Sequence, residues 1–88
     1  MKITARGKLE YIQAFTRRNP KYPNAIHLTE CIIEAGVRME KMQDILIECS
    51  TAVLKENILQ MIELQGREIK LECEYVFFDN NYQLIKIL

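Results

Sequence analysis

The sequence predicts an α+β fold, in which three helices are followed by a C-terminal antiparallel β-hairpin or three-stranded meander. Two observations favour it. Apolar residues recur at steps of three and four over residues 9–15 and 39–53, which is the spacing of one helix face. Residues 69–77 instead alternate between apolar and polar, the period of a half-buried strand. We therefore expect helices in the first two thirds of the chain and strands at its end.

The first helix is expected over residues 7–18. Leu9, Ile12 and Phe15 lie at helical spacing there. The segment NPKYPNA that follows contains two prolines and two asparagines, which end a helix and form a loop. Residues 25–28 then form a short extended piece.

A second helix is expected to begin at Thr29. Threonine is a good N-cap, and Glu30 in the first turn interacts favourably with the helix dipole. The helix is expected to break at Ala35-Gly36-Val37. A third helix follows to about residue 56, carrying an apolar stripe that ends at Val53.

Residues 50–65 have two interpretations. They form either a helix with Ser50 as its N-cap, or a strand that pairs with residues 67–78 through a turn at Gln65-Gly66-Arg67, and the hairpin is preferred. Asp79-Asn80-Asn81-Tyr82 is expected to form a turn, because Asp and Asn tolerate positive φ. Residues 82–88 are expected to return as the last strand.

The stretch TECIIEAGVRMEKMQDIL resembles the helix-turn-helix of bacterial transcription regulators. Cys31 and Ala35 precede the turn, Gly36 lies in it and Val37 follows, as that motif requires. One position departs from the pattern, because Ile32 stands where those regulators have a small residue. The resemblance implies a three-helix helix-turn-helix core, with the motif at residues 29–49.

The opening MKITARGK is similar to the start of one class of winged-helix regulators, some of which hold an iron–sulfur cluster. The order of the expected elements is also that of a winged-helix domain, so residues 1–88 are interpreted as one such domain. The cysteine cluster of those regulators is missing, because Cys31, Cys49 and Cys73 lie far apart in the sequence.

The zero net charge of the 88-residue chain conceals an asymmetry. Residues 1–28 carry six basic side chains and one acidic, whereas residues 29–88 carry six basic and eleven acidic. Such a split indicates a basic face for an anionic partner and an acidic face elsewhere. Because a chain this short buries only about 60–65% of its unfolded surface, we also expect a homodimer or another stable partner.

The function implied is a small, dimeric regulator that binds double-stranded DNA. Arg38, Lys41 and Gln43 on the expected recognition helix would read bases. The expected phosphate-binding residues are the basic side chains of the N-terminal region and of the wing: Lys2, Arg6, Lys8, Arg17, Arg18, Lys21 and Arg67.

A second hypothesis is a small phage- or mobile-element-type interaction protein that inhibits a host enzyme and does not bind DNA. Its basis is the acidic character of residues 29–88 and the 49% of apolar residues. Glu72 and Glu74 would then lie on the face that binds the partner.

The sequence does not indicate a metal site, a catalytic site or a phosphate-binding loop. His27 and Cys31 are four residues apart, but two further ligands for a metal site are missing. The three scattered glycines build no phosphate-binding loop, so we expect no enzyme, no metal and no cofactor. The charged N-terminus is unlike a signal peptide, and the three cysteines are read as buried thiols of a cytoplasmic protein.

Overall fold

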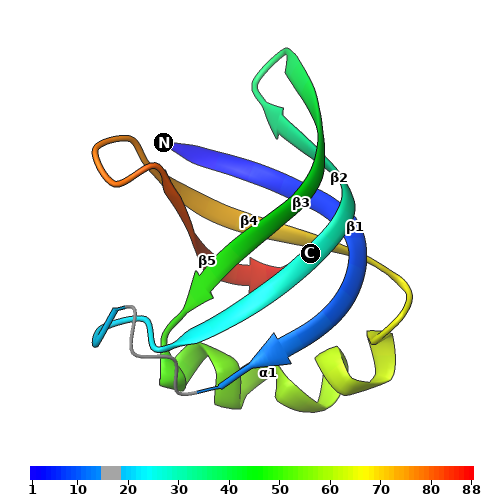
Figure 1. Ribbon diagram of the computed structural model, residues 1–88, viewed down its shortest axis with the longest axis vertical. Helices are drawn as coiled ribbons and strands as arrows, with labels where there is room; N and C mark the ends of the chain where they lie inside the picture. Colours follow the sequence, from blue (N-terminus) through cyan, green and yellow to red (C-terminus); the bar gives the residue numbers. More distant parts are fainter. Residues whose placement is uncertain (15–18) are drawn as a thin grey trace.

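The computed structural model describes residues 1–14 and 19–88, and strands dominate it (Figure 1). The predicted three-helix core is therefore wrong, because the described residues form a single helix. The elements in chain order are β1 (Lys2–Gln13), β2 (Asn24–Ala35), β3 (Arg38–Cys49), α1 (Thr51–Leu64), β4 (Glu68–Val76) and β5 (Asn81–Ile87).

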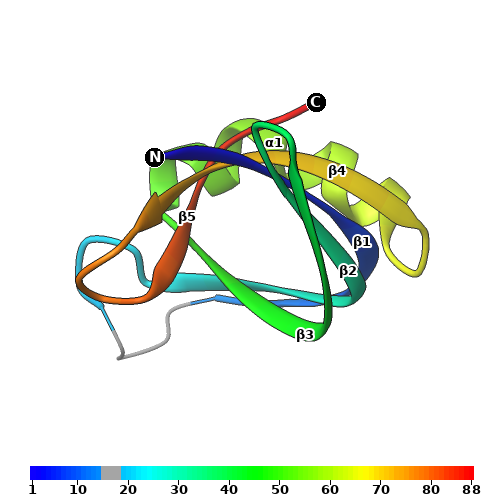
Figure 2. The ribbon, with the colours of Figure 1, turned by 90° about the horizontal axis from the view of Figure 1, so that it is seen from above.

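The five strands close into a barrel in the order β1-β2-β3-β5-β4 (Figures 1 and 2). β1 pairs antiparallel with both β2 and β4, which closes the barrel on one side. On the other side, β3 and β5 meet in a short parallel contact at Ile47↔Tyr82 and Glu48↔Gln83. A small five-stranded barrel with this crossover is the architecture called the OB fold.

β1 occupies most of the segment predicted to be a helix over residues 7–18. Its buried residues Ile3, Ala5, Gly7 and Leu9 alternate strictly with more exposed ones, as in a strand with one face in the core. A register shift between Leu9 and Tyr11 then displaces this alternation. The shift places two successive inward-facing apolar residues three positions apart, which resembles helical spacing.

The supposed helix-turn-helix is a β-hairpin. Ala35 pairs with Arg38 across a two-residue loop, and Gly36 in that loop has φ +63°. A glycine at the first central position is what a tight hairpin turn requires. The segment AGV is therefore a turn, as predicted, but it joins two strands instead of two helices.

A second feature imitates helical spacing in this hairpin. Along β2 the core residues step from Leu28 to Cys31, and along β3 from Met42 to Ile45. The two intervals lie opposite each other in the β2–β3 ladder. Glu30, which has φ 52°, lies within the β2 interval. Here both strands exchange their inner and outer faces, so the apolar pattern shows the interval of a helix.

α1 begins one residue after Ser50, whose hydroxyl accepts a hydrogen bond from the backbone N–H of Val53 at 3.2 Å. The helical alternative for residues 50–65 was therefore correct, and the preferred hairpin was wrong. Asn57 lies inside α1, and its side-chain amide donates a hydrogen bond to the carbonyl of Val53 at 2.8 Å. The helix lies across the lower end of the barrel, where Met61 is fully buried (Figure 1).

The end of the chain agrees with its prediction. β4 contains the alternating residues 69–75, with Ile69, Leu71 and Cys73 buried in the core. β5 pairs antiparallel with it, as the last strand of a meander should. The turn between them includes Asn80 at φ 49°, in the left-handed region expected for asparagine.

Candidate functional site

The three predicted base-reading residues lie on a strand. Arg38, Lys41 and Gln43 occupy the half of β3 nearest the hairpin turn, and all three are exposed. The structure thus has no helix at this position, and the predicted recognition helix is wrong.

The predicted phosphate-binding residues do not form one basic face in the described part of the chain. Lys2 is the first residue of β1 and Lys8 lies in its middle, and each pairs across the ladder with a glutamate of β4. Arg6 lies between Glu34 and Glu68, at 3.7 Å from each carboxylate. Lys21 lies between β1 and β2, and Arg67 lies between α1 and β4; Arg17 and Arg18 fall outside the described residues.

A row of side chains crosses the outer face of β1, β2 and β3. The rings of Tyr11 and His27 stack with centroids 4.1 Å apart and planes inclined by 17°. Leu46 is paired with His27 in the β2–β3 ladder and continues the row. This row was not predicted, because Tyr11 was assigned to a helix. The alternation from Ile3 to Leu9 was the signal that could have revealed the strand.

Two connections border this face on one side of the barrel (Figures 1 and 2). They are the described part of the β1–β2 loop, residues 19–23, and the β4–β5 turn, residues 77–80. Glu48 on β3 connects the first of them to Asn81, the residue of β5 that directly follows the second. Its two carboxylate oxygens accept hydrogen bonds from the Nδ2 atoms of Asn19 and Asn81, each at 3.0 Å.

Aromatic rings gather around the β4–β5 turn. The ring centroids of Tyr75 and Tyr82 lie 5.1 Å apart, and those of Tyr75 and Phe77 lie 6.5 Å apart in a T-shaped arrangement. Phe78 lies edge-on to Phe77 and has 97% of its surface exposed. The hydroxyl of Tyr75 donates to Asn80 Oδ1 at 2.7 Å and so ties the strand to its turn.

A cleft of about 370 Å³ separates this aromatic group from the β2–β3 hairpin. Ile3, Ile33 and Ala35 line it from the barrel, and Arg38 and Glu40 line it from β3. The cleft is therefore lined mainly by apolar and aromatic side chains, with Arg38 and Glu40 as its charged side chains.

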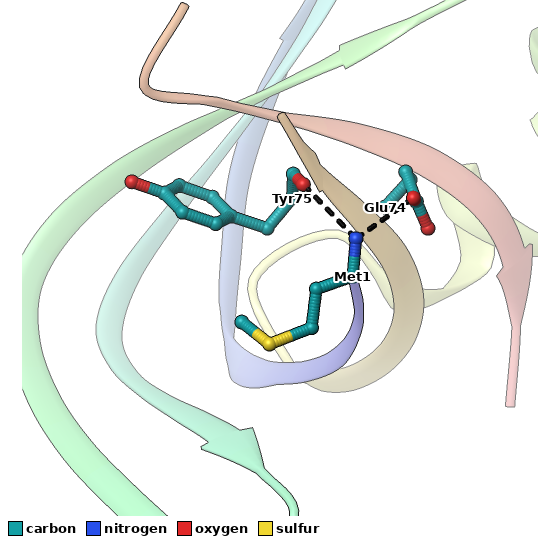
Figure 3. A network of polar contacts seen from close by, with 3 residues as sticks. All are labelled: Met1, Glu74 and Tyr75. Carbon is teal, nitrogen blue, oxygen red and sulfur yellow. Dashed lines mark hydrogen bonds and ion pairs between the residues drawn. The ribbon is translucent and has the colours of Figure 1, made fainter. Parts of the chain in front are cut away.

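The acidic pair of the second hypothesis lies on β4. Figure 3 shows that Glu74 accepts a hydrogen bond from the amine of Met1 at 2.8 Å. Glu72 pairs with Thr4 on one side and with Lys86 on the other. In this structure, therefore, Glu74 already has an ion-pair partner, and Glu72 has a cation opposite it.

The cysteines lie in the core. Burial raises the pKa of the Cys31 thiol to about 11 and the pKa values of Cys49 and Cys73 to about 12. A thiol with so high a pKa is a poor nucleophile at neutral pH. His27 stacks on the outer face whereas Cys31 is buried, and no cluster of three or more metal-ligating side chains occurs within residues 1–14 and 19–88.

Comparison with known proteins finds no matching family model, no matching curated protein and no matching solved structure. The described residues contain no helix with the length and apolar character that a membrane crossing requires.

Proposed function

We propose that this protein binds single-stranded nucleic acid across the outer face of β1, β2 and β3. The observation that carries the proposal is the stacked pair Tyr11 and His27 on that face, beside two connections that Glu48 links through Asn19 and Asn81. Barrels of this architecture bind oligonucleotides or oligosaccharides on the face of strands 2 and 3 and through these same two loops. That argument is one of analogy between folds, and only the side chains give it chemical content.

The aromatic residues supply the chemistry. A base stacks on an aromatic ring whatever its identity, and such a contact contributes about 1–3 kcal/mol per base. Tyr11, half exposed, and Phe78, almost fully exposed, present rings to solvent in the two regions of the proposed site. A duplex hides the faces of its bases, so these rings favour an unpaired strand.

The charge of the site predicts weak dependence on salt. The cations of this region are Lys21, Lys41 and, at the adjacent cleft, Arg38, whereas Glu10 and Asp44 are acids beside them. Three phosphate contacts on a single strand correspond to a slope of about −2 in log K against log salt. We therefore expect affinity to fall only about twentyfold between about 50 and about 200 mM salt.

The test is fluorescence anisotropy with labelled oligomers of about 15 nucleotides, comparing single-stranded DNA, RNA and duplex DNA. Tyr11→Ala and Phe78→Ala should each weaken single-strand binding by about fivefold to a hundredfold, and Tyr11→Phe should restore it. Leu59→Ala, an exposed apolar change on α1, is the matched control and should leave binding unaltered.

Two results would reject the proposal. One is absence of binding at about 50 mM salt, and the other is equal affinity of the wild type and Tyr11→Ala. Either would favour a protein partner instead, which Glu72→Gln and Glu74→Gln variants would then probe. Tighter binding to the duplex than to single strands would favour double-stranded DNA as the ligand, bound without a recognition helix.

A further inference from the structure

The cleft of about 370 Å³ between the β2–β3 hairpin and the aromatic group has two unlike walls. On the hairpin side, Glu40 pairs across the ladder with Ile33, a core residue. Residues directly opposite each other in an antiparallel pair project from the same face, so Glu40 points to the inner side of the hairpin. Arg38 lies two residues earlier on β3 and shares that face. The two charged side chains therefore enter the cleft side by side.

Aromatic rings form the opposite wall of the cleft. Tyr75, Phe77 and Tyr82 line it, and Phe77 is 78% exposed, so its ring is open to a ligand. Burial raises the pKa of the Tyr82 hydroxyl, and the neighbouring Tyr75 and Glu40 raise it further. The carboxylate of Glu40 thus lies near this wall, and the cleft combines aromatic surface with one cation and one anion.

The two charged side chains are available to a ligand. Arg38 and Glu40 are both exposed, and no ion pair of residues 1–14 and 19–88 involves either of them. The volume of the cleft lies near the lower end of the range of about 300–1,000 Å³ that is typical of small-molecule sites. The cleft therefore suits one planar ring system, and it is too small for a helix or strand of a partner protein.

This cleft is connected to the proposed nucleic-acid-binding face. β5 pairs with β3 only at Ile47 and Glu48, so the two strands diverge beyond these residues and leave a hollow of about 240 Å³. The hollow is lined by Leu46, which belongs to the row on the outer face, and by Tyr82, which also lines the cleft. A nucleic-acid strand on the face can therefore pass round the edge of β3 and place one base in the cleft.

We propose that the cleft binds one guanine of the single strand, stacked on the aromatic wall and contacted at its edge by Arg38 and Glu40. This inference rests on the proposed function, because it assigns a base to a strand bound there. Guanine carries two adjacent acceptors, O6 and N7, which match the paired N–H donors of an arginine. Its N1–H and N2–H are adjacent donors, which match the two oxygens of a carboxylate. Guanine thus makes a bidentate contact with each side chain.

The other bases satisfy this pair of side chains less well. Adenine and thymine have no two adjacent acceptors, and cytosine has only one donor group for the carboxylate. One bidentate contact discriminates between bases by about fivefold to a hundredfold, so guanine should be preferred by at least the lower figure. Arg38 contacts a base here instead of a phosphate. Binding of a guanine-containing strand should therefore depend less on salt than binding of an all-thymine strand.

Fluorescence anisotropy tests the preference with oligomers of about 15 nucleotides, one of alternating guanine and thymine and one of thymine alone. The wild type should bind the guanine-containing strand about fivefold or more tightly. Arg38→Lys keeps the charge without the paired donors, and Glu40→Gln keeps the shape without the charge. Each should remove most of the preference and change affinity for the all-thymine strand by less than about threefold. Glu63→Gln, at an exposed position of α1, is the matched control and should retain the preference.

Base analogues assign each contact to its side chain. 7-Deazaguanine lacks the N7 acceptor, and inosine lacks the N2 amino group. Either replacement should weaken binding to the wild type by about fivefold or more, because one side chain loses a charge-assisted hydrogen bond. Arg38→Lys should become insensitive to the deaza replacement, and Glu40→Gln should become insensitive to inosine. A merely structural role of the two residues would not produce this matched pattern.

The outcomes separate this inference from the proposed function. Equal affinity of the wild type for the two oligomers would overturn the guanine site and leave single-strand binding on the outer face intact. Binding of neither oligomer would reject the proposed function. The cleft is then tested alone by NMR with guanosine monophosphate at about 5 mM. Shifts of the Arg38 and Glu40 amide signals, larger than those with adenosine monophosphate, would support a guanine site, and their absence would overturn it.

Discussion

The carboxylate of Glu48 accepts a hydrogen bond from the side-chain amide of Asn81 at 3.0 Å. This bond connects β3 to the start of β5, in addition to their short parallel backbone contact. Its second oxygen accepts the amide of Asn19 at the same distance, from the loop before β2. The glutamate is 7% exposed, so these bonds replace solvation that the carboxylate loses on folding. One side chain thus positions both connections at the border of the candidate binding face.

Replacing Glu48 by methionine should cost about 1–3 kcal/mol of stability. Methionine has a similar length but no strong acceptor, so two amide donors lose their partner. Urea denaturation measures the change in the free energy of unfolding. Glu63→Met, at an exposed position of α1, is the control and should change stability by less than about 0.5 kcal/mol. Equal effects at the two positions would show that the bridge contributes nothing.

Gly7→Ala should destabilise the barrel by about 1–3 kcal/mol. A Cβ atom at Gly7 would lie 2.9 Å from the carbonyl oxygen of Thr29 and 3.1 Å from Cα of Cys31, both backbone atoms of β2. Because backbone cannot move aside as a flexible side chain can, β1 and β2 would have to separate. Thermal denaturation followed by circular dichroism measures the loss.

Gly66→Ala provides the comparison. No atom lies within 4 Å of a Cβ at that position, so its cost comes only from φ +81°, at about 1–2 kcal/mol. Serine variants at the same positions distinguish a steric clash, expected at Gly7, from backbone strain, expected at Gly66. Gly7→Ser should be worse than Gly7→Ala, whereas Gly66→Ser should match Gly66→Ala. Equal losses of stability for Gly7→Ala and Gly7→Ser would contradict close packing of β1 against β2.

The sequence predicted β4 correctly because its apolar residues alternate without interruption, and β5 followed from the asparagine turn before it. Ile69, Leu71 and Cys73 all face inward, and the pattern of period two is direct. β1, β2 and β3 carry irregularities where helices were predicted. The register shift after Leu9 and the change of face beside Glu30 each insert a step of three into a strand.

These irregularities explain the error in fold class. Combined with Thr29, a good N-cap residue, and Gly36, a good turn residue, they satisfied every local rule for two helices. The fold is determined by long-range strand pairs such as Thr4↔Glu34 and Lys2↔Glu74. The local spacing of apolar residues does not reveal such pairs. The Tyr11–His27 row was missed for the same reason, since it exists only when β1 lies beside β2.

Met61→Ala should lower stability by about 2–5 kcal/mol. Met61 is fully buried and carries the contact of α1 with the barrel core, so its truncation leaves a cavity. Its neighbour Ile62 is 58% exposed, and Ile62→Ala should cost less than about 1 kcal/mol. Urea denaturation of the two variants compares a buried and an exposed position one residue apart. Similar losses would mean that α1 packs by another face.

Stability should fall as pH rises above about 9, because of the buried thiols. Folding raises the pKa of Cys73 from 9.0 to about 12, chiefly through burial, so the unfolded chain releases its proton first. Its contribution is complete below pH 9 and is lost progressively between about pH 9 and 12, by about 1.4 kcal/mol per pH unit. Cys49 acts in the same direction, since its pKa is also raised to about 12.

Urea denaturation of the wild type and of Cys73→Ala from pH 8 to 10.5 isolates this effect. Lysines and tyrosines titrate in both proteins, so the difference between their two slopes reports the thiol alone. The variant is expected to be less stable at pH 8, because of the cavity, and to lose stability less steeply above pH 9. Parallel slopes would mean that the Cys73 thiol ionises as readily in the folded barrel as in the unfolded chain.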